Sequence, residues 1–160
     1  MATVAQNRIT RSVNPYSLFE SAKALISSAI SFNQGDLLYL DTTNHLIKPI
    51  ALAADSATFL GIARVTISSG KLVSPYQGTA VDAAQAISDI PGPQAGVVAK
   101  LKLNSGDSFT SGCDVYPVAG DAQTVTVTGG VGISAIGVFQ GAAVTAGAGS
   151  EGEVYLRAVK

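Results

Sequence analysis

The stretch Gly35-Asp36-Leu37-Leu38-Tyr39-Leu40-Asp41 sets the pattern around which this chain is organised. Residues 33–36, Asn-Gln-Gly-Asp, have the composition of a turn, and the apolar run 37–41 behind them predicts a strand buried on both faces or nearly so. The run 59–65, Phe-Leu-Gly-Ile-Ala-Arg-Val, follows further on. Residues 59–67 predict another strand, in which apolar residues alternate with polar ones near its end, so one face is exposed to water.

The same two blocks occur again in the second half of the chain. Gly112-Cys113-Asp114-Val115-Tyr116-Pro117 repeats the first block, and Ala135-Ile136-Gly137-Val138-Phe139 repeats the second. The leading glycines of the first blocks are 77 residues apart, and the central glycines of the second blocks are 76 residues apart. Each half also has a later apolar partner, residues 97–101 in the first half and 153–157 in the second. We therefore expect four strands from each half: a glycine-led strand, a return strand, a strand with a central glycine and a closing strand.

This pattern predicts an all-β fold. Two copies of a unit are too few for a solenoid, so we expect an antiparallel β-barrel or sandwich, jelly-roll-like or tulip-like, with pseudo-duplicated halves. A single β domain over residues 15–160 would follow an N-terminal arm over residues 1–14, which is polar, lacks periodicity and ends at Asn14-Pro15. Residues 16–28 fit a helix capped by Asn14, whereas residues 24–32 fit a strand, which we favour slightly.

A long insertion distinguishes the first half from the second. It spans residues 68–96, and it contains three of the six prolines, Pro75, Pro91 and Pro93. A short helix is possible over residues 80–87. Loops of this length are usually functional or make contacts outside the domain.

Two further local features follow from residue type. The turn at residues 42–45 should close a hairpin, with Asn44 as the residue that tolerates a positive φ. Residues 124–128, Thr-Val-Thr-Val-Thr, alternate strictly and predict a half-exposed strand.

The composition bounds the class of protein. The chain has 160 residues, enough for one domain with its own core, and 47% of them are hydrophobic whereas only 13% are charged. The mean hydropathy is +0.34. No run of 18 or more apolar residues occurs, so we expect no membrane span. The apolar excess is explained either by the many small residues of a β protein or by burial against other subunits.

The charges argue against nucleic acid as a partner, because the formal net charge is −1 and no basic cluster could neutralise phosphates. Between Leu103 and Leu156 there are five acidic residues and no Lys or Arg, whereas Arg8 and Arg11 lie in the first segment. The N-terminus lacks the apolar core of a signal peptide, and the single cysteine, Cys113, cannot form an internal disulfide. Both features fit assembly in a reducing cytoplasm.

No combination of residues supports catalysis, a metal site or a cofactor. His45 is the only histidine and is expected to be exposed at a hairpin tip, and Cys113 is expected to be a small buried hydrophobe without a nearby base. The segment 129–132, Gly-Gly-Val-Gly, lacks the Gly-Lys-Ser/Thr ending of a phosphate loop. The remaining acids are interpreted as turn residues and solubilising charges, namely Asp107, Asp114 and Asp121.

The segment 35–44, continuing through Lys48-Pro49-Ile50-Ala51 and residues 55–63, resembles structural proteins of tailed bacteriophages, in particular the small capsid decoration (cement) proteins. The end of the chain is similar in style, where residues 136–139 lead through an Ala/Gly turn to residues 151–156. The insertion and the arm depart from the family pattern. The resemblance implies an antiparallel β protein that forms a homotrimer on the capsid exterior and clamps neighbouring capsomers.

From this resemblance we expect a non-enzymatic virion protein that is assembled in the host cytoplasm and stabilises an icosahedral head. Its partners would be the phage major capsid protein and sister copies, with no nucleic acid and no membrane. The irregular, partly apolar segments suggest the contacts: for the capsid Arg8, Arg11, Val13 and Tyr16, and for the oligomer Pro75, Tyr76, Ile90 and Pro91. A carbohydrate-binding or host-adhesion module is the alternative, although the chain has no Trp to offer as a platform. A small hydrolase is a third hypothesis.

Overall fold

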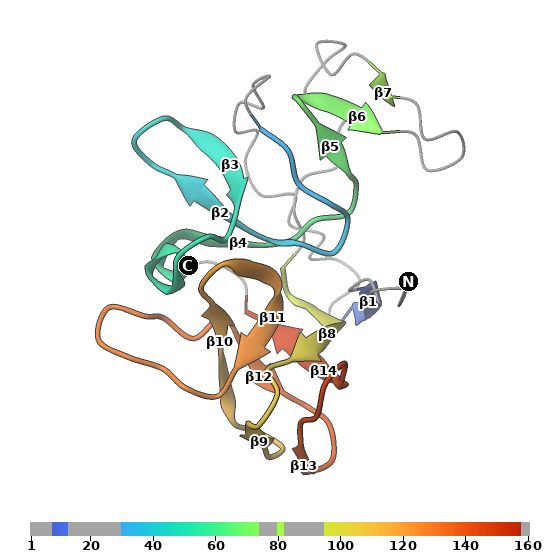
Figure 1. Cartoon of the computed structure of the whole chain (residues 1–160), viewed down its shortest axis with the longest axis vertical. Helices are drawn as coiled ribbons and strands as arrows, with labels where there is room; N and C mark the ends of the chain where they lie inside the picture. The colour runs from blue at the N-terminus through green and yellow to red at the C-terminus, as the bar shows by residue number, and fades with distance from the viewer. Residues whose placement is uncertain (1–7, 13–29, 74–79, 82–94, 158–160) are drawn as a thin grey trace.

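Strands make up most of the regular structure in the computed structural model, which describes residues 8–12, 30–73, 80–81 and 95–157 (Figure 1). The all-β prediction is therefore confirmed. The strands in chain order are β1 Arg8–Ser12, β2 Leu37–Asp41, β3 Leu46–Pro49, β4 Phe59–Ile62, β5 Ile67–Ser68, β6 Lys71–Val73, β7 Ala80–Val81, β8 Val97–Leu103, β9 Ser108–Phe109, β10 Asp114–Val118, β11 Asp121–Thr126, β12 Gly137–Phe139, β13 Val144–Thr145 and β14 Glu151–Leu156. A 3-10 helix, η1 Ala53–Thr58, separates β3 from β4.

The second half of the chain forms a closed ring of five strands in the order β8-β11-β10-β12-β14. The ring closes because β14 pairs antiparallel with β8, from Glu151 opposite Lys102 to Tyr155 opposite Val98. All contacts in the ring are antiparallel except the one between β11 and β8, which is parallel. The expectation that residues 97–101 close the first half is wrong, because β8 is one of the five strands of this ring.

The interior of the ring is filled by side chains that alternate along the strands. Along β8, the residues Val97, Ala99, Leu101 and Leu103 all belong to one buried cluster. The rings of Phe109 and Phe139 contact each other in the same cluster at a tilt of 46°, with their centroids 5.3 Å apart. Burial of these side chains removes a large apolar area from water and is the main source of stability for the ring.

The first half forms a three-stranded sheet, β3-β2-β4, which lies between two cores. Leu37 belongs to the cluster inside the ring, together with Ile50, Phe59 and Ile62, so this sheet packs against the ring. Leu38 points to the opposite face and joins a second cluster with Phe32. Because both leucines are almost fully buried, the prediction that this strand is covered on both faces is confirmed.

The two glycine-led blocks share one local hydrogen-bond pattern. Gly35 has a φ of 91° and Gly112 a φ of 87°, the left-handed conformation that favours glycine. The Gly35 N–H donates to the carbonyl of Ala63 (2.9 Å), and the Gly112 N–H donates to the carbonyl of Phe139 (2.8 Å). Beyond these turns the halves differ, since one continues into an open sheet and the other into a closed ring. A duplication of whole halves stays a prediction.

The strand expected over residues 59–67 ends early. Strand β4 stops at Ile62, and β5 begins only at Ile67 and pairs with β6 in another sheet. The break follows Ala63, whose N–H donates to the carbonyl of Asp36 and whose carbonyl accepts the Gly35 N–H. The turn before β2 therefore forms the backbone hydrogen bonds of Ala63, at the point where the expected strand ends.

The insertion and the arm contain short strands that the sequence did not predict. Strands β6 and β7 pair antiparallel within the insertion, so Ala80, where a helix was expected to start, begins a strand. Strand β1 lies in the expected arm and pairs antiparallel with β8, Arg8 opposite Lys100 and Ser12 opposite Val97. The helix or strand expected between residues 16 and 32 lies outside the described residues up to residue 29.

Two local expectations are corrected by hydrogen bonding. In β11, Thr124 and Thr126 are both buried, so this strand is not half-exposed as its alternation suggested. Their hydroxyls donate to carboxylates, Thr124 to Asp121 (2.7 Å) and Thr126 to Asp107. At the first hairpin the positive φ, 56°, falls on His45 and not on Asn44.

Candidate functional site

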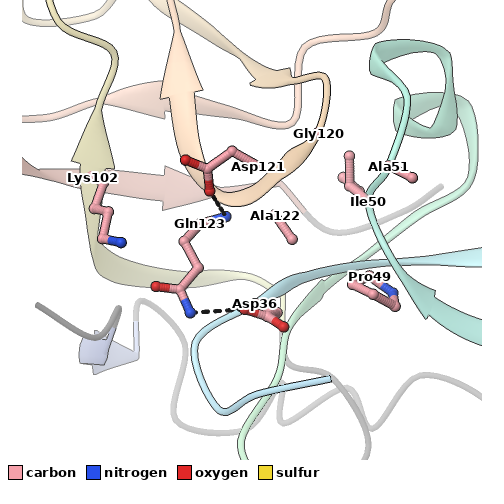
Figure 2. A pocket seen from close by; sticks show the side chains of 9 residues that line it. All are labelled: Asp36, Pro49, Ile50, Ala51, Lys102, Gly120, Asp121, Ala122 and Gln123. Atoms are coloured by element: carbon pink, nitrogen blue, oxygen red, sulfur yellow. Dashed lines mark hydrogen bonds between the residues drawn. The ribbon is translucent and has the colours of Figure 1, made fainter. Parts of the chain in front are cut away.

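An open pocket of about 450 Å³ lies where the first half meets the ring. One wall comes from Asp36, just before β2, and from the end of β3 with the two residues after it. The other wall comes from β8 and from the turn between β10 and β11 with the start of β11 (Figure 2). Its described lining residues are Asp36, Pro49, Ile50, Ala51, Lys102, Gly120, Asp121, Ala122 and Gln123.

Hydrogen bonds across this pocket tie the two halves together. The Gln123 amide donates to Oδ1 of Asp36 over 2.8 Å, and the Gly120 N–H donates to the carbonyl of Ala51 over 2.8 Å. Figure 2 shows Gln123 reaching from its strand to Asp36. The second oxygen of Asp36 accepts the Asn33 N–H (2.7 Å). Asp36 therefore closes its own turn and also joins the halves.

The second carboxylate of the pocket, Asp121, is also held by structural hydrogen bonds. Its two oxygens accept the Gln123 N–H (2.9 Å) and the Thr124 hydroxyl (2.7 Å). Among the described lining residues none is Ser, Cys or His. Lys102 contributes a positive charge to the wall. The hydrogen bonds of Asp36 and Asp121 therefore serve the junction between the two parts of the chain.

An ion pair joins the two strands of the β2–β3 hairpin. The Lys48 ammonium donates to Oδ2 of Asp41 over 2.5 Å, and the Asn44 amide donates to the same oxygen over 2.8 Å. The hydrogen bond from Lys48, and to a smaller extent the one from Asn44, hold the pKa of Asp41 well below its ordinary value. The same pair raises the pKa of Lys48. Tyr39 lies on β2 opposite Lys48, and burial and then the Asp55 charge raise the pKa of its hydroxyl.

Two further ion pairs lie on the outside of the ring. Lys100 Nζ lies 3.4 Å from Oε2 of Glu151, on the paired strands β8 and β14. Arg157 Nη2 lies 2.6 Å from Oδ1 of Asp114, with both side chains about half exposed. The exposed Arg157–Asp114 pair contributes little stability, because water and ions screen it.

The residues predicted to contact a capsid or sister subunits are only partly placed. Arg8 and Arg11 lie on β1, at the edge of the sheet that contains β8, with Arg11 opposite Val98. Val13 and Tyr16 lie outside the described residues, as do the four positions expected at the oligomer interface, Pro75, Tyr76, Ile90 and Pro91. The structure therefore brings together none of the predicted groups beyond the two arginines.

The single histidine and the single cysteine lie far apart in the sequence and in different environments. His45 is exposed in the turn before β3, as expected. Cys113 is half-buried at the start of β10 and packs against the large core cluster. Within the described ranges, no group of three or more His, Cys, Asp or Glu side chains is placed to hold a metal ion.

The acids of the second half have structural roles that sequence reasoning missed. Asp107 accepts the Thr126 hydroxyl and the Val127 N–H (3.2 Å), so it anchors the turn after β8 to β11. Asp121 caps the start of β11 as described above. The signal that could have revealed these roles is the pairing of aspartates in turns with threonines on a strictly alternating strand, since buried hydroxyls need acceptors.

Comparisons with known proteins add no relative. No protein-family model matches the chain, and no curated protein matches it. Among the residues that the structure describes, no helix has the length and apolar character needed to cross a membrane.

Proposed function

We propose that this chain is a structural virion protein that binds the exterior of an icosahedral phage head and stabilises its lattice without catalysis. The observation that carries the proposal is the resemblance to capsid decoration proteins, because the resembling segments are those that build the fold. Residues 35–44 form the first glycine turn, β2 and the hairpin turn, and residues 136–139 include β12. Residues 151–156 are β14, which closes the ring.

The position of β1 supports a role for the N-terminal segment in attachment. Strand β1 ends its sheet in the order β1-β8-β11, so among the described strands only β8 pairs with it. The sequence of β1 contains two basic residues, Arg8 and Arg11. An exposed strand edge is a template for pairing with another chain, and capsid proteins would be the partner here.

The physical mechanism is mass action. A protein that binds only the expanded lattice stabilises that state by RT ln(1 + [L]/Kd), which is about 2.7 kcal/mol for each site at a free concentration of 100 Kd. Linking three copies in a trimer raises the effective concentration of the second and third contacts. The many structural hydrogen bonds of the ring suit such a role, because a rigid binder loses little entropy on attachment.

Cosedimentation with empty heads, built from the capsid protein of the same phage, tests the proposal. Heads carrying the protein should resist heat better than bare heads. Reversing one charge at a time, Arg8→Glu or Arg11→Glu, should weaken cosedimentation at least tenfold, whereas Arg157→Glu is the matched control elsewhere on the surface and should bind normally. Deleting residues 1–14 is a less clean test, because it also removes β1 from its pairing with β8. Heads that neither bind the protein nor gain heat resistance would refute the proposal.

The pocket at the junction gives little support to the carbohydrate-binding alternative. Sugars are commonly held against the flat face of an aromatic ring, and no aromatic residue occurs among the described residues that line this pocket. Binding on a glycan array would favour that alternative over the capsid role.

A further inference from the structure

The N-terminal strand β1 is held on one side only. Among the described strands it pairs with β8 alone, whereas the C-terminal strand β14 lies between β12 and β8. A strand near the end of the chain can leave its sheet without moving an element on its other side, and for β1 a single ladder of hydrogen bonds has to open. Of the two strands nearest the chain ends, β1 is therefore the one that leaves its sheet more easily.

Strand β1 covers a part of the β8 edge that no other described strand covers. Because β14 pairs with residues 98–102 of β8, both β1 and β11 must lie on the other edge of β8. On that edge β11 pairs only with residues 102–103, and β1 pairs with residues 97–100 (Figure 1). Release of β1 would leave an unpaired strand edge, which is a template for pairing with another strand.

The structure itself shows which strand fits this edge. The antiparallel ladder between β1 and β8 begins with Arg8 opposite Lys100, and its register shifts between Ile9 and Arg11. A second copy of the chain carries the same strand, so it offers this edge the same hydrogen bonds in the same register. Exchange of identical segments is for this reason a low-cost route to oligomers. The matching occupant of a vacated β8 edge is therefore the β1 of another copy.

The chain that follows β1 is long enough to cross to a neighbouring copy. Strand β1 ends at Ser12, and the next described part begins at Ile30, whose carbonyl accepts the Gly70 N–H (2.8 Å). The connection over residues 13–29 can span at most roughly 60 Å. A domain of this size has a radius of gyration of about 15 Å, so an adjacent copy lies within that reach.

We propose that β1 is exchanged between copies of this chain, so that the β1 of one copy pairs with the β8 edge of its neighbour. The inference goes beyond the proposed function, because exchange requires no phage head, and it assigns the link between copies to residues other than the insertion. Both arrangements form the same hydrogen bonds, so concentration decides between them. A tether of this length gives an effective concentration on the order of millimolar. Exchange is therefore rare in dilute solution and frequent when copies are held side by side.

Disulfide trapping between two full-length chains tests the exchange, because an oxidised bond accumulates even a rare arrangement. Cys113→Ala first removes the only cysteine. One chain then carries Arg8→Cys, and a second, isotope-labelled chain carries Lys100→Cys. The two thiols lie opposite each other only when the β1 of the first chain pairs with the β8 of the second. Opposite residues of antiparallel strands are about 5 Å apart, which is within the range of a disulfide.

Glu153→Cys is the matched control. Glu153 is exposed on β14 and lies opposite Lys100 on the other side of β8. A thiol there is two strand spacings, about 10 Å, from the Arg8 position, which is too far for a disulfide. This chain is mixed in turn with the Arg8→Cys chain and with the Lys100→Cys chain. Mass spectrometry should find at least ten times more mixed disulfide between Arg8→Cys and Lys100→Cys than in either control, and equal yields would overturn the proposal.

Two further measurements test the steps on which exchange depends. A chain carrying both Arg8→Cys and Lys100→Cys, oxidised in dilute solution, should close a disulfide within itself, and failure to close would overturn the register and the proposal with it. In the unaltered chain, the amides of β1 that bond to β8 should exchange their hydrogens at least tenfold faster than the amides of β14 that bond to β8. Equal protection would overturn the proposal, because β1 would not be released. Circular dichroism of each variant confirms that the fold is retained.

The outcomes separate this inference from the proposed function. A chain that exchanges β1 but never cosediments with heads supports the inference and refutes the virion role. A chain that binds heads without exchanging β1 overturns the inference and leaves the virion role in place.

Discussion

Replacing Gly137 by alanine tests how the ring closes. Gly137 lies on β12 opposite Leu156 of β14, and a Cβ at this position would overlap the carbonyl oxygen of Tyr155 and come within 2.8 Å of a methyl carbon of Val154. The carbonyl belongs to the backbone of a paired strand, so it cannot rotate away as a side chain would. Alanine should therefore push β14 from β12 and weaken the pairing that completes the ring.

Overpacking of this kind typically lowers the free energy of unfolding by about 1–3 kcal/mol. Because the Cβ would meet a backbone atom, we expect a loss of about 3 kcal/mol. For a chain of this size that corresponds to a fall in Tm of roughly 6–12 °C. Thermal and urea unfolding, followed by circular dichroism, measure the loss.

Gly147→Ala is the matched control for this experiment. A Cβ at Gly147 would meet only the Ser150 hydroxyl, at 4.0 Å, and Gly147 does not adopt a left-handed conformation. Its free energy of unfolding should stay within about 0.5 kcal/mol of the wild-type value. If Gly137→Ala unfolds at the same midpoint as Gly147→Ala, the close approach of β12 to β14 is not as described, and the account of ring closure is wrong.

Two further predictions concern carboxylates. Asp107→Ala should lower the free energy of unfolding by about 1–3 kcal/mol, because the buried Thr126 hydroxyl loses its acceptor. Asp114→Ala removes only a half-exposed ion pair and should lower it by less than about 1 kcal/mol. Equal losses in urea unfolding would contradict the structural role of Asp107. Because the pKa of Asp41 is lowered in the folded protein, this carboxylate stabilises the fold at pH values above its ordinary pKa of about 4, and the stabilisation is lost as the pH falls below that value. Asp41→Asn should therefore flatten the acid side of a plot of Tm against pH. An unchanged slope would argue against the ion pair with Lys48.

Local structure followed the sequence wherever glycine or a long apolar run left one choice. The limits of β2 agree with the strand predicted over residues 37–41. Gly35 and Gly112, which lead the two repeated blocks, adopt the left-handed conformation that is costly for other residues.

Tertiary contacts decided the features that sequence periodicity could not resolve. The alternation of residues 124–128 suggested a face exposed to water, yet Thr124 and Thr126 are buried. Asp121, at the start of the same strand, accepts the Thr124 hydroxyl, and Asp107, in the turn after β8, accepts the Thr126 hydroxyl. Similarly, the run after Phe59 breaks at Ala63 because the turn before β2 binds its backbone. For Thr126 and for Ala63, a hydrogen-bond partner distant in sequence changes the outcome of a local pattern.

The sequence by itself determined the β class, the glycine turns and most strand positions, because these depend on steric limits and solvation of neighbouring residues. Only the tertiary structure decided that β8 pairs with β14 to close a ring, and that the first half packs on that ring through Leu37 and Phe59. Strand partners are chosen by the total burial that a whole arrangement achieves, and an apolar strand carries no local mark of which apolar edge will cover it.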